Sequence, residues 1–249
     1  MAIDYLVDTE WLEQHLEDAE LRIFDCTVHR WIDDDGVFCI ARGDAEYKEG
    51  HIPGAAHLDL VEDLSDSASN LRFTLPSPER FAQAVASHGV SDDSRVVLYG
   101  TREIQYTTRV WWMFRVFGFE NVAVLDGGWQ AWAREGRPTT TQVPHHPKGV
   151  FTPRFRPELV ADKAAVLAAM EDPSTCVINA LAPDIHSGET HVHFGPREQT
   201  SRPGRIPGSV NAWALEMIDK DTNKFLPLAG LEAKFRAVGA LEKDKITTY

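Results

Sequence analysis

The stretch GHIPGA at residues 50–55 decides the fold, because the chain repeats it as GRIPGS at residues 204–209. In each copy two glycines bracket a proline-centred turn, which is the composition of a tight bend leading into a strand. Upstream, the run RIFDC at residues 22–26 is matched by CVINA at residues 176–180, at the same spacing as the two turns. The shared order and spacing of these segments indicate an internal duplication.

The repeat continues towards the end of each half. The stretches ERFAQAVASHGV at residues 79–90 and LEAKFRAVGAL at residues 231–241 are both amphipathic at helical spacing. A short apolar strand that ends in tyrosine follows each of them, VVLY at residues 96–99 and ITTY at residues 246–249. Short apolar strands that alternate with helices are typical of a mostly parallel sheet covered by helices. The sequence therefore predicts an α/β protein made of two similar domains.

A proline-rich stretch separates the two domains. Residues 138–157 contain five prolines and a run of threonines. They cannot form a helix and are expected to be an extended linker. This linker leaves an N-terminal domain at residues 1–137 and a C-terminal domain at residues 158–249.

Composition excludes several classes of protein. Of the 249 residues, 43% are hydrophobic and 25% are charged, as in a folded globular chain, and no apolar run approaches the roughly 20 residues that span a bilayer. The acidic start has no apolar stretch of a secretory signal, and three cysteines without a CxxC pair make neither a disulfide framework nor a zinc site. The net charge of -13 argues against binding to nucleic acid. We therefore expect a cytoplasmic protein, a monomer or weak dimer, that binds neither nucleic acid nor membranes.

Several motifs together resemble one known family. They are Asp25, Glu46-Tyr47 with the GHIPGA that follows, RVWWMFR at residues 109–115, LDGGW at residues 125–129 and RIPGSVN at residues 205–211. In these motifs the chain resembles the tandem-domain rhodaneses, the thiosulfate and 3-mercaptopyruvate sulfurtransferases, over essentially its whole length. The resemblance implies two rhodanese-like domains, each a mostly parallel five-stranded sheet with helices on both faces. It also implies a non-catalytic first domain and a catalytic second one.

The reaction that the resemblance implies needs a cysteine directly after the strand that ends in tyrosine. Inward-pointing backbone N–H groups and a helix N-terminus would lower the pKa of that thiol. The thiolate would take a sulfur from an anionic donor, hold it as a persulfide and pass it to cyanide or a thiol, with no metal or organic cofactor. In the first domain Tyr99 is followed by Gly100, so this nucleophile is absent. In the second domain we expect the cysteine immediately after Tyr249 and a domain that is incomplete in this chain.

The resemblance also implies residues that face the substrate. Tyr106 and His29 match positions from which the first domain faces the active site. Arg197 lies near the position of an arginine that grips the anionic donor, and a guanidinium suits thiosulfate or a carboxylate because it offers paired N–H donors. A solvated loop position is the alternative for Arg197. Trp213 is a further aromatic candidate, with packing in the core as its alternative.

The three cysteines of the chain are not expected to replace the missing nucleophile. Cys26 and Cys176 lie in or beside predicted buried strands, where a thiol is usually an inert small hydrophobe. Cys39 is expected in a loop after an acidic stretch, whose charge would raise the pKa of its thiol.

The second domain departs from the family pattern. Asn179 and Leu181 stand where the family has Asp and Arg, and Arg205 replaces the histidine of the first turn. His191 and His193 could suggest a metal, but no third ligand is near them in the sequence, so no metal site is expected. Two alternatives stay open: a catalytically inactive rhodanese-like module that serves binding or regulation, and a cysteine phosphatase on the same fold.

Overall fold

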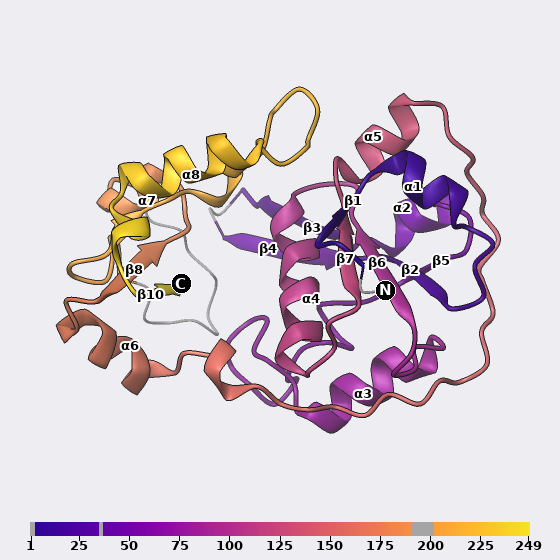
Figure 1. Ribbon diagram of the computed structural model, residues 1–249, viewed down its shortest axis with the longest axis horizontal. Helices are drawn as coiled ribbons and strands as arrows, with labels where there is room; N and C mark the ends of the chain where they lie inside the picture. Colours follow the sequence, from indigo (N-terminus) through magenta and orange to yellow (C-terminus); the bar gives the residue numbers. More distant parts are fainter. Residues whose placement is uncertain (1–2, 35–36, 191–201) are drawn as a thin grey trace. The chain divides into compact units, whose positions relative to one another are not determined.

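The computed structural model describes residues 3–34, 37–190 and 202–249 (Figure 1). The chain folds as two compact units. The first comprises Met1–Trp31 and Cys39–Arg156, and the second comprises Ile32–Phe38 and Pro157–Tyr249.

A five-stranded sheet forms the centre of the first unit. Its strands lie in the order β1-β7-β6-β2-β5 and every neighbouring pair is parallel. Their bounds are β1 (Leu6–Val7), β2 (Leu21–Asp25), β5 (Ala55–His57), β6 (Arg95–Tyr99) and β7 (Val122–Leu125). The parallel five-stranded sheet predicted for a domain of this family is confirmed. Its register sets Asp25 beside both Tyr99 and His57 at the carboxyl ends of three strands.

Five helices and most of a separate hairpin complete the first unit. The helices are α1 (Thr9–Gln14), α2 (Asp44–Glu49), α3 (Pro78–Ser87), α4 (Ile104–Val116) and α5 (Gly128–Arg134). The hairpin pairs β3 (Val28–Ile32) with β4 (Phe38–Arg42), of which Ile32 and Phe38 belong to the second unit.

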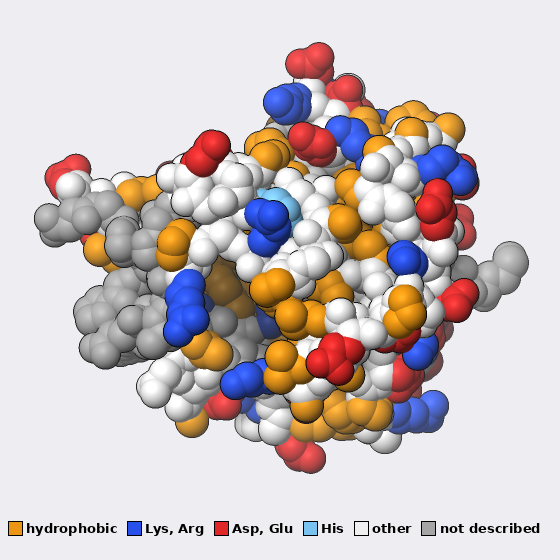
Figure 2. Space-filling model, turned by 90° about the vertical axis from the view of Figure 1, so that its left-hand side faces the viewer, with side chains coloured by type: hydrophobic (Ala, Val, Ile, Leu, Met, Phe, Trp, Pro, Cys, Tyr) orange, Lys and Arg blue, Asp and Glu red, His pale blue; other side chains and the backbone are white. Residues whose placement is uncertain are grey.

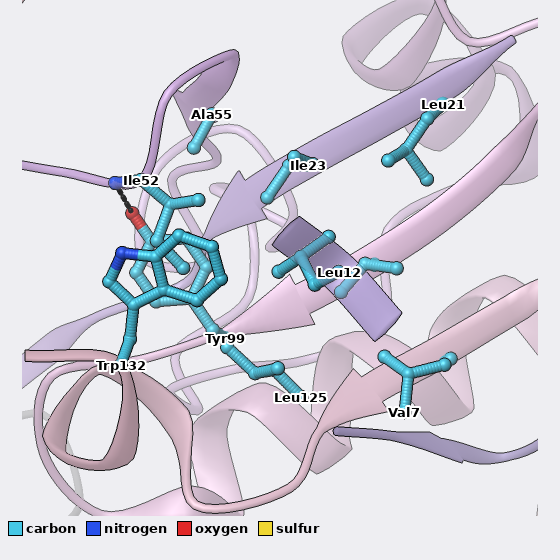
Figure 3. Packing of buried hydrophobic residues seen from close by; sticks show 11 residues of the cluster. Val7, Leu12, Leu21, Ile23, Ile52, Ala55, Tyr99, Leu125 and Trp132 are labelled. Atoms are coloured by element: carbon cyan, nitrogen blue, oxygen red, sulfur yellow. Dashed lines mark hydrogen bonds between the residues drawn. The ribbon is translucent and has the colours of Figure 1, made fainter. Parts of the chain in front are cut away.

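Successive side chains of a strand point to opposite faces of the sheet, and in β2, β6 and β7 the side chains on both faces are buried. Helices therefore cover both faces of this sheet. On one face Ile23 and Tyr99 pack with Leu12 of α1 and Trp132 of α5 (Figure 3). On the other face an aromatic cluster joins α3 to α4, with the ring of Phe81 centred 5.1 Å from that of Phe114. Burial of each such side chain stabilises the fold by about 1.5–3 kcal/mol.

The second unit has the same arrangement on a smaller scale. Its three described strands form a parallel sheet in the order β10-β8-β9. The elements are α6 (Lys163–Glu171), β8 (Thr175–Asn179), α7 (Pro183–Ser187), β9 (Val210–Asn211), α8 (Leu228–Ala237), β10 (Lys245–Thr248) and three short 3₁₀ helices at Pro157–Leu159, Ala214–Met217 and Ala240–Glu242.

The duplication is visible in the details of the backbone. Asp8 accepts a hydrogen bond from the N–H of Trp11 at 2.7 Å and so caps α1, and Asp162 caps α6 in the same way. Gly54 and Gly208 have the same φ of 79°, a left-handed conformation that favours glycine. The two halves therefore share these local features of the backbone.

The stretch predicted as a linker packs along the first unit (Figure 1). Its backbone exchanges two hydrogen bonds of 2.9 Å between Thr140 and His51. Further along, the N–H of Gly149 donates to Ala86 at 2.8 Å, and the buried side chain of Phe151 packs on Phe81. The segment is extended, as its prolines predict, but its apolar side chains attach it to the unit that precedes it.

Among the residues that the structure describes, no helix is both long enough and apolar enough to cross a membrane.

Replacing Gly149 tests this attachment. A Cβ at Gly149 would lie 2.0 Å from the carbonyl oxygen of Val90, so Gly149→Ala should force the segment away from α3. We expect the free energy of unfolding to fall by about 1–3 kcal/mol in urea denaturation, as for other overpacked sites. Gly50→Ala is the matched control, because a Cβ at Gly50 meets nothing within 4 Å. Equal effects of the two substitutions would contradict close packing of the segment.

Candidate functional site

The carboxyl ends of the strands form the candidate site, and in the first unit Asp25 lies at its centre. One carboxylate oxygen of Asp25 accepts a hydrogen bond from the N–H of Thr27 at 2.9 Å and another from the Thr27 hydroxyl. The other oxygen, Oδ2, is buried. Burial raises the pKa of Asp25, and the hydrogen bonds from Thr27 and Tyr99 together with the neighbouring His57 offset only part of that effect.

The loop from Gly100 to Glu103 connects β6 to α4, where the resemblance places the reacting cysteine of a catalytic domain. Its Thr101 N–H donates to the Thr27 hydroxyl at 2.9 Å, and its Thr101 carbonyl accepts from Gln130 at 2.6 Å. A Cβ at Gly100 would lie only 2.8 Å from the Thr107 hydroxyl oxygen. A side chain at this position of the first unit would therefore crowd the Thr107 hydroxyl.

Glu46 of α2 forms hydrogen bonds with polar groups of this loop. Its carboxylate accepts hydrogen bonds from the Thr101 hydroxyl at 2.6 Å and from Arg102 at 2.7 Å. Burial opposes ionisation, but these two bonds and the nearby His29 lower the pKa of Glu46 overall. The Thr101 hydroxyl and the Arg102 guanidinium thus both donate hydrogen bonds to the Glu46 carboxylate.

Two of the predicted substrate-facing residues belong to the first unit. His29 is half-buried in β3, with Nε2 3.5 Å from the Glu46 carboxylate. Tyr106 is buried in the first turn of α4, with its ring centred 5.6 Å from that of Phe73, and burial raises the pKa of its hydroxyl. His29 thus lies beside Glu46 and the loop after β6, whereas Tyr106 packs against Phe73 of a neighbouring loop.

At the carboxyl ends of its strands, the second unit has neutral side chains in the positions of Asp25 and His57. Asn179 takes the place of Asp25 and accepts a hydrogen bond from the N–H of Leu181 at 2.8 Å. Asn211, in the register position of His57, donates to the carbonyls of Asn179 at 3.0 Å and Leu181 at 2.8 Å. Amides thus replace the carboxylate and the imidazole of the first unit.

Tyr249 directly follows β10 and corresponds to Tyr99, the last residue of β6. Its N–H donates to the carbonyl of Ile178 at 3.0 Å, and its own carbonyl accepts from Ala180 at 3.1 Å. The side-chain hydroxyl accepts a hydrogen bond from the N–H of Ile206 at 2.8 Å. The end of β10 is therefore bonded both to β8 and to the repeated turn at residues 204–209.

The remaining predicted residues have different outcomes. Trp213 is half-buried between β9 and the 3₁₀ helix that follows, and its carbonyl accepts from Glu216 at 3.0 Å. Arg197, His191 and His193 lie outside the described residues. The structure thus describes one of the second unit's two predicted substrate-facing residues.

Arg205 contributes an exposed positive charge next to the repeated turn. Its closest described polar contact is weak, at 3.5 Å from the carbonyl of His186.

An apolar groove also borders this turn. It has a volume of about 390 Å³ and is lined by Lys163, Val166, Leu167, Met170, Ile206 and Pro207. Figure 2 shows hydrophobic side chains exposed among charged ones, and Leu167, Ile246 and Tyr249 are among the large exposed ones of the second unit.

The chain contains three cysteines, and the structure describes all of them. Cys26 directly follows β2 and is fully buried, and burial together with the charge of Asp25 raises the pKa of its thiol well above the usual value. Burial likewise raises the pKa of Cys176 in β8. Cys39, predicted in a loop, instead lies half-buried in β4. A raised pKa makes a thiol a poor nucleophile at neutral pH, so Cys26 and Cys176 are suited to packing. The position of the nucleophile after Tyr249 stays a prediction.

Sequence reasoning missed two contributors to the strand ends. Ser209 holds the last position of the second turn, where the first turn has Ala55, and its hydroxyl lies 2.9 Å from that of Tyr249. The difference between GHIPGA and GRIPGS was visible in the sequence, but the partner is 40 residues away. Glu46 was noticed only as part of a motif, because its partners Thr101 and Arg102 are brought to it by the fold.

Comparison with known proteins agrees with this geometry. Residues 8–135 match the model of the Rhodanese-like domain. The chain is 34% identical to 3-mercaptopyruvate sulfurtransferase of Escherichia coli, over 88% of this chain and 74% of that protein. It is 31% identical to thiosulfate sulfurtransferase of Mus musculus, over 96% of this chain and 76% of that protein. The crystal structure of SseA from Escherichia coli, described as a 3-mercaptopyruvate sulfotransferase, superposes with a TM-score of 0.83 at 30% identity and covers 99% of this chain and 88% of that one.

The difference between Asp25 and Asn179 predicts that only the first unit loses stability through this position as pH rises. Because burial raises the pKa of Asp25 above its unfolded value, the folded first unit binds more protons than the unfolded chain between those two pKa values. Its stability should therefore fall as pH rises through that interval.

The Asp25→Asn variant should remove this fall, since an amide keeps the acceptor for Thr27 without a buried charge. Denaturation followed by tryptophan fluorescence between pH 4 and pH 8 reports mainly the first unit, because Trp213 is the only tryptophan of the second. The reciprocal variant Asn179→Asp should introduce a fall in the stability of the second unit. An unchanged pH dependence in Asp25→Asn would show that Asp25 ionises freely in the folded protein.

Proposed function

The chain belongs to the tandem-domain rhodanese sulfurtransferases, and we propose that it moves a sulfane sulfur from a small anionic donor to cyanide or a thiol acceptor. The donor is thiosulfate or 3-mercaptopyruvate. The observation that carries the proposal is the arrangement of the strand ends in the second unit. Asn179 accepts the N–H of Leu181 as Asp25 accepts that of Thr27. The carbonyl of Tyr249 accepts the N–H of Ala180 as that of Tyr99 accepts the N–H of Cys26.

The proposed chemistry takes place in the loop that would begin after Tyr249. A cysteine at that position would correspond to Gly100 of the first unit, at the start of the loop that leads into a helix. Backbone N–H groups and a helix N-terminus would favour its thiolate form. The thiolate would attack the outer sulfur of the donor and form a persulfide, while sulfite or the enolate of pyruvate leaves with the electron pair and the enolate takes up a proton. Cyanide or a thiol would then attack the outer sulfur and release the thiolate again.

The first unit supports the second without reacting itself in this proposal. It offers no side chain at Gly100, and the Thr107 hydroxyl stands where a Cβ would need space. Glu46 occupies Thr101 and Arg102, which an anionic donor would otherwise contact. An anion is thus disfavoured at the first site by a carboxylate that is already in place.

A positive charge in the second unit suits an anionic donor. The guanidinium of Arg205 is exposed beside the turn at residues 204–209, and Arg197 is the further arginine that we propose for gripping the donor. His29, Tyr106 and Trp213 are the remaining residues proposed to face the substrate. The proposed reaction needs no metal or organic cofactor, because the cysteine itself carries the transferred sulfur atom as a persulfide.

One observation favours a second function, a rhodanese-like module that binds or regulates without catalysis. The second unit has Asn179 and Leu181 where the family pattern has Asp and Arg, so it lacks a carboxylate and a guanidinium at its strand end.

A sulfur-transfer assay distinguishes the two functions. Full-length protein given thiosulfate or 3-mercaptopyruvate together with cyanide should release thiocyanate, which is measured colorimetrically as the iron complex. Replacing the cysteine after Tyr249 with alanine should lower the rate by at least about 10³-fold, as the loss of a nucleophile does. Cys39→Ala in the first unit is the matched control and should leave the rate unchanged. Absence of thiocyanate with both donors would favour the inactive module.

A further inference from the structure

The hydroxyl of Tyr249 closes a ring of hydrogen bonds with the repeated turn. It accepts from the N–H of Ile206 at 2.8 Å and lies 2.9 Å from the hydroxyl of Ser209. The Ser209 hydroxyl donates its only proton to the carbonyl of Ile206 at 2.8 Å. Tyr249 must therefore donate to Ser209, so that every proton in the ring has one acceptor.

The corresponding tyrosine of the first unit has a different polar attachment. The hydroxyl of Tyr99 accepts from the N–H of Ile52 at 3.4 Å (Figure 3). The residue that corresponds to Ser209 is Ala55, which has no hydroxyl, so the ring cannot close. Tyr99 is fully buried, packs against Trp132 and other apolar side chains, and its hydroxyl also interacts with the carboxylate of Asp25.

The hydroxyl of Tyr249 makes two short hydrogen bonds, with Ile206 and Ser209, and these fix the direction of its aromatic ring. The polar ring is thus present in the unit to which we assign catalysis and absent from the unit to which we assign none.

The position of the ring relates it to the reaction. The backbone of Tyr249 is bonded to β8 through Ile178 and Ala180, so its side chain links the end of β10 to the turn. The amide that it accepts from belongs to Ile206, the neighbour of Arg205. The loop that would carry the reacting sulfur begins at the next residue after Tyr249. One hydroxyl therefore ties the start of that loop to the segment that bears the exposed guanidinium.

We propose that Tyr249 is a positioning residue for sulfur transfer, acting through its hydrogen bonds to Ile206 and Ser209. This inference rests on the proposed function of the second unit. The hydroxyl fixes the start of the reacting loop relative to the turn of Arg205, so that thiolate and anionic donor meet in a constant geometry. Displacement of a reacting group by about 1 Å is enough to slow an enzymatic step strongly.

The experiment compares the same substitution in the two units. Tyr249→Phe keeps the aromatic ring and removes the hydroxyl, and Tyr99→Phe makes the identical change in the first unit. Steady-state rates of the full-length protein are measured with thiosulfate or 3-mercaptopyruvate and cyanide, and the melting temperature of each variant is recorded beside them.

We expect Tyr249→Phe to lower kcat at saturating donor about 5- to 20-fold, the size expected for losing two neutral hydrogen bonds. KM should change less than about threefold, because the donor-binding groups remain. Ser209→Ala should lower kcat by less, and the double variant should be no slower than Tyr249→Phe, since the two residues act in one ring. Tyr99→Phe should leave kcat within about twofold even if it lowers the melting temperature more, as a buried hydroxyl allows.

A purely structural role is recognised by a different pattern. If Tyr249→Phe lowers the melting temperature but leaves kcat within about twofold, the positioning role is overturned while the sulfurtransferase function stands. If the parent protein releases no thiocyanate with either donor, the proposed function fails and the positioning role falls with it.

Discussion

The alignment of the carboxyl ends of parallel strands is the constraint on which the candidate site depends. In each unit the residue after the central strand donates its N–H to the carbonyl of the tyrosine on the next strand, from Cys26 to Tyr99 at 2.8 Å and from Ala180 to Tyr249 at 3.1 Å. Because parallel strands point in one direction, these bonds bring three strand ends to one edge of the sheet. The polar side chains, the loop into the following helix and the repeated turn all take their positions from that edge.

The two units use this edge differently because their side chains have diverged on a common backbone. The first unit places a buried carboxylate and an imidazole side by side at Asp25 and His57, and fills its loop with hydrogen bonds to Glu46. The second unit has amides at the same places and a tyrosine held by a closed ring of hydrogen bonds. Duplication supplied two equal frames. The distribution of charge and of space at the strand ends therefore differs between the two units.

Much of the fold could be predicted from the sequence because its signals are local. The strands at Leu21–Asp25 and Arg95–Tyr99 are short apolar runs, and the helices at Pro78–Ser87 and Leu228–Ala237 have apolar residues at helical spacing. The strand β4 was not predicted, although residues 38–41 are apolar, because the acidic stretch before them suggested a loop and the strand pairs only with its neighbour in a hairpin. The packing of residues 138–156 on the first unit was also missed, because prolines report the conformation of a segment and not its contacts.

The candidate site was less predictable than the fold because its contacts are distant in the sequence. The resemblance suggested His29 and Tyr106, but their different surroundings, a carboxylate for one and Phe73 for the other, depend on the tertiary structure. Ser209 and Tyr249 are 40 residues apart and meet only when β10 pairs with β8. Spacing within a motif carries no information about such a pair.

The position of the persulfide tests the central claim most directly. Full-length protein is treated with thiosulfate or 3-mercaptopyruvate, alkylated and analysed by tandem mass spectrometry of its peptides. A persulfide adds one sulfur atom, about 32 Da, to the cysteine that holds it. We predict this mass on a cysteine that directly follows Tyr249. The same mass on Cys26, Cys39 or Cys176 would contradict the assignment of the reaction to the strand ends of the second unit.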